Sequence, residues 1–303
     1  MTPFRSLGIA FHIFLFLATW FGNPVVCVAI WRFRALRTVS NVIIFSLAIA
    51  DLLMTAVFIF RIIALSSGKE YSTACHYISE FAFTIICVII LHLTCISVDR
   101  FIAIKFPLRY KTVVTRRRMK AAIVSIWVMS VIGTVVLPHS LPKAEYEDFV
   151  DYYDKFHLCI THAGDHQFKN TSKVFAAAII ILYFIVPFII TLSSYIYIIK
   201  VSRNQQVRLK NEAQLEREAA RKIEIKVAIT YGIVIGAFML CFLPLLVGTL
   251  YQQFVSERRE DVVLTMKILS TLASVSACVN PGVYTWRSQE FRKAFKIIIA
   301  RTH

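Results

Sequence analysis

Several ionisable or strongly polar residues of this sequence lie within long apolar runs. Asp51 lies in the middle of one run, Asn23 and Asn280 lie in two others, and the pair Asp99-Arg100 ends a fourth. Ionisable groups are costly inside a membrane and mark function by default, for example as an ion site or a switchable ion pair. One such aspartate alone can be a chance hydrogen-bonded residue, whereas several polar residues at corresponding depths indicate a functional interior.

The composition indicates a membrane protein. Of the 303 residues, 57% are hydrophobic and 17% are charged, whereas a soluble domain carries about 25% charged residues. A net charge of +16 also suits a nucleic-acid-binding protein, but these basic residues gather in loops beside apolar runs, where anionic lipid headgroups attract them. We therefore expect the lipid bilayer, and no nucleic acid, as a partner.

Seven apolar runs are long enough to cross a bilayer, which takes roughly 20 residues of helix. The runs are continuous rather than alternating, so they predict helices and not the strands of a barrel. We expect an all-α membrane protein: a seven-transmembrane helix bundle over residues 1–286, then a short amphipathic eighth helix and tail over 287–303. The predicted spans are residues 7–30, 41–63, 76–98, 120–137, 173–199, 223–251 and 262–286.

The distribution of charge predicts the orientation of the chain. Lysine and arginine gather in the first, third and fifth loops and in the tail, and the loop after the fourth span is acidic. Short loops rich in lysine and arginine stay in the cytoplasm. The sequence therefore predicts a multi-pass protein of the plasma membrane with an extracellular amino terminus and a cytoplasmic eighth helix.

Short motifs in these runs resemble those of the rhodopsin-like, or class A, G-protein-coupled receptors over nearly the whole chain. All of them occur in the matching spans and in the same order. The resemblance implies a ligand-activated receptor that passes an extracellular signal to a heterotrimeric G protein, performs no covalent chemistry and needs no cofactor. The matching motifs are Gly22-Asn23, Leu47-Ala48-Ile49-Ala50-Asp51, Asp99-Arg100-Phe101, Pro107-Leu108, Trp127, Pro187, Tyr195, Phe238-Met239-Leu240-Cys241-Phe242-Leu243-Pro244 and Asn280-Pro281-Gly282-Val283-Tyr284.

The resemblance also implies a switch at the cytoplasmic side. Asp99 would hold Arg100 inward, and Glu224 would form a second bridge; the alternative for Glu224 is a surface residue paired with neighbouring basic residues. A kink at Pro244 would let span six swing outward and admit a helix of the G-protein α subunit. The residues that the family assigns to coupling and activation are Asp99, Arg100, Tyr195, Glu224, Phe238, Phe242, Pro244, Asn280, Pro281 and Tyr284.

The chain departs from the family pattern at the centre of the bundle. Phe242 stands where the family usually has tryptophan at the floor of the ligand pocket. A sodium ion bound by Asp51 with Asn280 is one interpretation of the polar centre. The other is a hydrogen-bonded or partly protonated Asp51, because Ile89 and Ala277 stand where the family supplies polar groups to the ion.

The ligand is not predicted, but two classes are disfavoured. Ala82 stands where aminergic receptors carry an aspartate, and Ser274 stands where opsins carry the retinal-binding lysine. The chain is therefore predicted to be neither a typical aminergic receptor nor a retinal-binding opsin. The expected pocket is an apolar cleft with few polar anchors, lined by Phe81, Ala82, Ile85, Phe242, Leu246, Thr271 and Ser274.

Two cysteines lie outside the membrane, where disulfides persist. Cys75 begins span three at its outer end, Cys159 lies in the second outer loop, and the other five cysteines lie in spans. We expect a disulfide between Cys75 and Cys159, and the family resemblance implies the same pair. Asn170 begins a glycosylation sequon in an outer loop.

Two alternative functions remain open. A seven-helix transporter or light-driven pump also holds polar groups at mid-membrane, although such proteins usually show internal repeats and broken helices, which this sequence does not indicate. A non-signalling receptor would bind a ligand without coupling, but the intact Asp99-Arg100, Tyr195 and Tyr284 argue against it.

Overall fold

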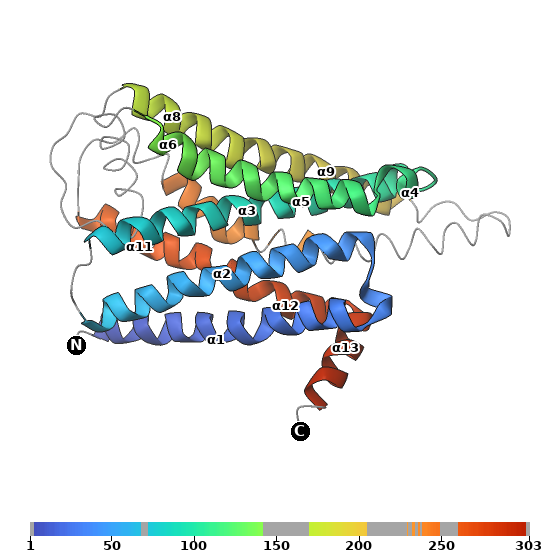
Figure 1. The fold of residues 1–303 in the computed structure, drawn as a ribbon, viewed down its shortest axis with the longest axis horizontal. Helices are drawn as coiled ribbons and strands as arrows, with labels where there is room; N and C mark the ends of the chain where they lie inside the picture. The colour runs from blue at the N-terminus through green and yellow to red at the C-terminus, as the bar shows by residue number, and fades with distance from the viewer. Residues whose placement is uncertain are drawn as a thin grey trace.

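The chain forms a bundle of long helices in a computed structural model (Figure 1). The structure describes residues 3–67, 72–141, 170–204 and 260–300, together with residues 229, 232–233, 236 and 238–248. These residues form helices, and no strand occurs among them. The predicted all-α, seven-helix fold is confirmed.

Each predicted span corresponds to helix among the described residues. Spans one to three are the continuous helices α1, α2 and α3, and five helices of 24–29 residues are long and apolar enough to cross a membrane. The bounds are α1 Pro3–Arg32, η1 Arg34–Leu36, α2 Val39–Ser67, α3 Ser72–Lys105, α4 Tyr110–Val113, α5 Arg116–Val131, η2 Ile132–Val136, α6 Leu137–His139, α8 Asn170–Ile180, η3 Ile181–Ile185, α9 Val186–Asn204, Phe238–Gly248, α11 Glu260–Ser274, α12 Ser276–Arg287 and α13 Gln289–Ala300.

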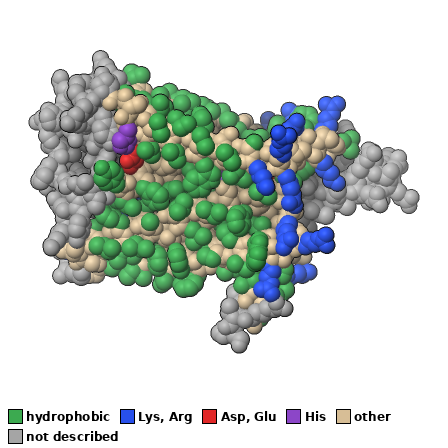
Figure 2. Space-filling model, in the orientation of Figure 1, with side chains coloured by type: hydrophobic (Ala, Val, Ile, Leu, Met, Phe, Trp, Pro, Cys, Tyr) green, Lys and Arg blue, Asp and Glu red, His purple; other side chains and the backbone are tan. Residues whose placement is uncertain are grey.

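The bundle presents apolar side chains on its flank and basic side chains at one end (Figure 2). Trp20, Phe21 and Leu240 are at least half exposed, as suits side chains that face lipid. The exposed basic residues, Arg32, Arg34, Arg37, Lys105, Arg109, Lys111, Arg116, Arg117, Arg118, Lys120, Lys200, Arg292, Lys293 and Lys296, lie at or near helix ends and on α13. This separation of apolar flank and basic end is the pattern of a membrane protein.

Polar side chains lie inside the bundle and bond to one another. His92 Nδ1 lies 2.8 Å from the Val88 carbonyl oxygen, so this nitrogen carries the proton and Nε2 is the acceptor. Ser46 Oγ donates to His92 Nε2 at 2.8 Å and accepts from Trp127 Nε1 at 3.0 Å. One hydroxyl thereby joins α2, α3 and α5 in a fully satisfied network.

Spans four and five each widen into a π-helical turn, a feature that the hydrophobic pattern does not predict. Gly133 lies in η2 of span four and Tyr183 lies in η3 of span five, and a Cβ at Gly133 would lie 2.2 Å from the Tyr183 hydroxyl. Tyr183 donates to the Met129 carbonyl oxygen at 2.6 Å. The two irregular turns therefore face each other, with glycine making room for the tyrosine.

Span seven is interrupted, whereas the sequence predicts one continuous helix. The α-helix ends at Ser274 and resumes at Ser276. Val275 N–H donates to Leu272 O at 3.0 Å, and Cys278 N–H donates to Val275 O at 3.1 Å. These bonds span three residues instead of four, so the helix tightens locally at this point.

The eighth helix, α13, is amphipathic as predicted. Phe291, Ala294 and Phe295 are buried, whereas Arg292 and Lys293 are exposed. The helix turns away from the bundle axis after α12 (Figure 1) and packs against α1 and α12. Its apolar face therefore covers the end of the bundle and leaves the basic face outside.

A close contact between α1 and α12 generates a stability prediction. A Cβ at Gly22 would lie 2.9 Å from Pro281 Cγ, whereas a Cβ at Gly282 would meet nothing within 4 Å. We expect Gly22→Ala to lower the free energy of unfolding by about 1–3 kcal/mol through overpacking. Thermal unfolding of the purified protein measures the change, with Gly282→Ala as the control. Equal midpoints for the two variants would contradict this packing.

Candidate functional site

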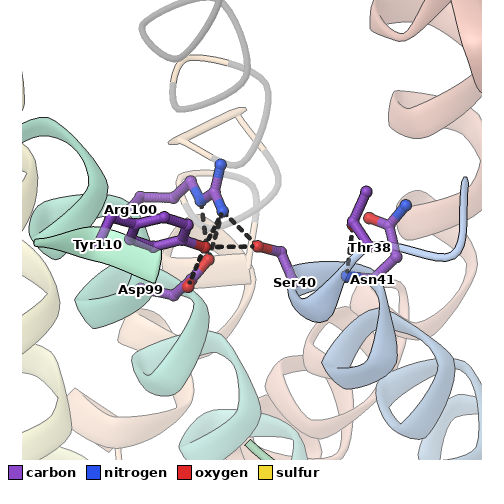
Figure 3. Close-up of polar contacts among 6 residues, drawn as sticks. All are labelled: Thr38, Ser40, Asn41, Asp99, Arg100 and Tyr110. Atoms are coloured by element: carbon purple, nitrogen blue, oxygen red, sulfur yellow. Dashed lines mark hydrogen bonds and ion pairs between the residues drawn. The ribbon is translucent and has the colours of Figure 1, made fainter. Parts of the chain in front are cut away.

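A buried cluster of charged and hydroxyl groups lies at the basic end of the bundle (Figure 3). Asp99 and Arg100 are each 4% exposed and form an ion pair through Asp99 Oδ2, with Arg100 Nε 3.0 Å from that oxygen. Arg100 Nη2 also donates to Ser40 Oγ at 2.5 Å and to the Tyr110 hydroxyl at 3.3 Å. The pair that the sequence predicts is therefore held by two further residues.

The remaining bonds of the cluster follow from counting protons. Tyr110 donates its one hydroxyl proton to Asp99 Oδ1 at 2.8 Å. Ser40 must then be the donor in its 3.0 Å bond with Tyr110. Burial, followed by the negative charge of Asp99, raises the pKa of Tyr110 to about 12. The tyrosine therefore keeps its proton at neutral pH, and both carboxylate oxygens are satisfied.

Local structure places the four residues together. Asp99 and Arg100 lie near the end of α3, Ser40 is the second residue of α2, and Tyr110 begins the short helix α4. The start of α2 is fixed by a cap, because Asn41 N–H donates to Thr38 Oγ1 at 3.2 Å. The sequence analysis missed Ser40 and Tyr110, since a hydroxyl at the start of a helix gives no signal of which charge it will meet.

The polar centre of the bundle brings Asp51 and Asn280 together as predicted. Asn280 Nδ2 donates to Asp51 Oδ2 at 2.7 Å, and Asp51 Oδ1 is buried without a hydrogen-bond partner. One oxygen is thus available to a cation, but Ile89 and Ala277 are buried apolar residues of the main core. These two positions therefore supply no side-chain oxygen, and a sodium ion bound by Asp51 with Asn280 stays a prediction.

Aromatic side chains pack on spans five, six and seven. Phe238 and Phe242 stack with ring centroids 4.2 Å apart. Tyr284 is buried and stacks on Phe291 of α13 with centroids 5.6 Å apart. Tyr195 lies against the sixth span, where a Cβ at Gly232 would be 2.8 Å from the tyrosine Cε1. The Tyr195 ring therefore fills the space between spans five and six at Gly232.

The predicted pocket residues lie in the other half of the bundle. Ala82, Ile85 and Phe242 are buried in the main core, with Phe81 packed against it. Ser274 is also buried and accepts a hydrogen bond from Arg61 Nη1 at 3.5 Å. Thr271 and Leu246 are half-buried, and Pro244 is half-buried in the same helix as Leu246.

Arg61 is a functional candidate that the sequence analysis missed. It is 6% exposed and lies within α2, whereas its position near the end of the predicted span suggested no special role. A charge inside a run of apolar residues was the signal that could have identified it.

The structure does not describe the side chains of four predicted site residues. Glu224 and Cys159 belong to the undescribed parts of the chain, and the side chains of Cys75 in α3 and Asn170 in α8 are not described either. The disulfide, the glycosylation site and the second bridge therefore stay predictions.

Comparison with known proteins decides the family. A family profile described as "7 transmembrane receptor (rhodopsin family)" matches residues 22–284. This chain belongs to the rhodopsin family of seven-transmembrane receptors. Its family members are receptors and not enzymes, and the apolar helices make it a multi-pass membrane protein.

Individual relatives of the receptor are named for different ligands. It is 30% identical over 295 residues to the adenosine receptor A2a of Canis lupus familiaris, covering 93% of this chain and 69% of that receptor. It is 28% identical to the histamine H2 receptor of Homo sapiens, covering 93% and 76%. It is also 28% identical to the octopamine receptor beta-1R of Drosophila melanogaster, covering 93% and 59%.

These relatives correct one prediction. The exclusion of aminergic receptors is not borne out, because receptors named for histamine and octopamine are as similar to this chain as adenosine receptors are. The exclusion rested on the single residue Ala82, and one position of a pocket is a weak basis for deciding its ligand.

The cluster around Asp99 generates a second stability prediction. We expect Tyr110→Phe to lower the stability of the receptor by about 1 kcal/mol, because Asp99 Oδ1 loses the hydrogen bond that satisfies it. The control is Tyr197→Phe, since Tyr197 makes ring contacts with Phe101 but no hydrogen bond among the described residues. Thermal unfolding of both variants measures the difference, and an unchanged midpoint for Tyr110→Phe would refute the assigned bond.

Proposed function

We propose that this protein is a ligand-activated receptor that promotes nucleotide exchange on a heterotrimeric G protein. It lies in the plasma membrane with its basic end and α13 in the cytoplasm and its amino terminus outside. The observation that carries the proposal is the buried Asp99–Arg100 pair at the basic end of the bundle. Membership of the rhodopsin family supports the same function.

The cluster acts as the closed position of a switch. A buried ion pair contributes little net stability, because desolvation offsets much of the attraction between the charges. Arg100 is held by Asp99, Ser40 and Tyr110 from three different elements. A conformational change that separates these elements frees the guanidinium to bind carbonyl or carboxylate groups of the G protein. A ligand shifts this balance by the difference between its affinities for the two states.

Movement of the sixth span opens the cytoplasmic cavity in this mechanism. Pro244 removes a backbone hydrogen bond within the helix Phe238–Gly248, which lets the helix bend there. The stacked pair of Phe238 and Phe242 lies beside this proline in sequence and couples the bend to the pocket. Tyr195 and Tyr284 then turn toward Arg100. In the closed state, before this movement, Glu224 forms a second bridge.

Neutralising the central charge tests the proposal. We expect Arg100→Ala to reduce GTPγS exchange on a panel of purified G proteins by roughly tenfold or more, the change that a loss of about 1.4 kcal/mol produces. The receptor is reconstituted in lipid nanodiscs and its basal exchange is compared with that of empty discs. Arg109→Ala removes an exposed charge from the same face and is the control. Wild-type exchange by Arg100→Ala would overturn the assignment.

The contact between spans five and six gives a second functional test. A methyl group at Gly232 collides with Tyr195, and overpacking of this kind costs about 1–3 kcal/mol. Moving span six outward relieves the collision, so we expect Gly232→Ala to raise basal nucleotide exchange about three- to tenfold. Gly236→Ala is the control, because a Cβ there meets nothing within 4 Å. Equal exchange by the two variants, at equal amounts of receptor, would rule out this wedge effect.

A further inference from the structure

Arg61 is a buried cation that lacks a buried counter-ion among the described residues. Its guanidinium donates to Ser270 Oγ at 3.0 Å, to His12 Nε2 at 3.2 Å and to Ser274 Oγ at 3.5 Å. All three acceptors are neutral groups, and within the described part of the chain no carboxylate lies within ion-pair distance of it. A buried charge without a partner of opposite sign is unfavourable, and an ionisable residue inside a membrane span marks function by default.

The neighbouring histidine is held as an acceptor. His12 Nδ1 lies 2.8 Å from the Gly8 carbonyl oxygen, so that nitrogen carries the proton. Nε2 then has a lone pair and accepts from Arg61. The imidazole is therefore neutral in this arrangement and leaves the positive charge of Arg61 uncompensated.

One donor of the guanidinium has no partner among the described residues. Arg61 Nε is buried and has no hydrogen-bond partner. The Nε–H lies on the same edge as one N–H of Nη2, and this edge binds a carboxylate or phosphate through two parallel hydrogen bonds. Nε is thus the donor of this edge that an anion can engage, beside the Nη2 that also donates to Ser270 Oγ.

The position of this edge suits a ligand that enters from outside. Arg61 lies ten residues beyond Asp51, roughly 15 Å along α2 and away from Arg100. It joins α1, α2 and α11 in the half of the bundle that holds Ser274. Arg5 donates to the Leu65 carbonyl oxygen one turn further along the same seam between α1 and α2.

We propose that Arg61 is the anion-binding residue of the ligand pocket, and that the ligand of this receptor carries a carboxylate or phosphate group. His12, Ser270 and Ser274 orient the guanidinium from α1 and α11. The inference deepens the proposed function, since it names the class of ligand that the receptor takes. The anion belongs either to a soluble ligand or to a lipid headgroup, and the experiment below separates these sources.

The test measures thermal stability of the purified receptor in neutral phosphatidylcholine nanodiscs, without a G protein. The probes are benzoate, its neutral isostere benzamide, and inorganic phosphate at constant ionic strength. We expect benzoate or phosphate to raise the unfolding midpoint where benzamide does not. Arg61→Met and Arg61→Lys should each weaken the fitted affinity roughly ten- to hundredfold, because the first loses the charge and the second loses the fork. Arg5→Met is the control that retains the response.

A second arm replaces part of the phosphatidylcholine with phosphatidylserine. Stabilisation by this lipid that depends on Arg61, without a response to benzoate or phosphate, assigns the anion to a headgroup. A structural role of Arg61 predicts instead that Arg61→Met lowers the midpoint of the unliganded receptor. Removal of an uncompensated charge should leave that midpoint unchanged or raise it.

Three results would overturn the inference: no anion-specific stabilisation in either arm, an equal response in Arg61→Met, or an unliganded Arg61→Met that is less stable than the parent. Because nucleotide exchange is not measured, failure of the anion site leaves the proposed coupling intact. Failure of Arg100→Ala to lose exchange would in turn leave the anion site intact.

Discussion

Hydrocarbon offers a polar side chain no hydrogen-bond partner, so the polar groups of this bundle must find their partners among the helices. Ser46 illustrates the rule, because its single hydroxyl satisfies His92 and Trp127 on two other helices. Asn280 and Asp51 follow it at the centre of the bundle. These contacts between helices constrain how the helices are rotated, whereas Ser97 and Ser194 bond to carbonyl oxygens of their own helices.

The two buried arginines show how surroundings decide the role of one residue type. Arg100 has a carboxylate and two hydroxyl groups around it, so the closed state is locally complete. Among the described residues, Arg61 has neutral acceptors only, and its Nε has no partner. The first arrangement suits a contact that is broken during activation, and the second suits a group that awaits an anion.

Small residues determine how closely the helices approach. Gly22 contacts Pro281, Gly133 makes room for the Tyr183 hydroxyl, and Gly232 lies against Tyr195. Packing of this kind is a main source of helix association where lipid and side chains are equally apolar. Each of these contacts joins two different spans, and the π-helical turns of spans four and five accompany the second one. The same contacts that hold the bundle together therefore lie beside the residues proposed to move.

The sequence by itself determined the class of this protein: apolar runs of sufficient length predict the membrane helices, and the adjacency of Asp99 and Arg100 predicts their ion pair. It did not predict that Tyr110 and Ser40 complete that pair, that Arg61 meets Ser270, or that span seven breaks at Val275. Arg61 and Ser270 are 209 residues apart, and their contact depends on the rotation and tilt of separate helices. Local hydrophobic patterns set where a helix begins and ends, whereas only tertiary packing decides which of its side chains face each other.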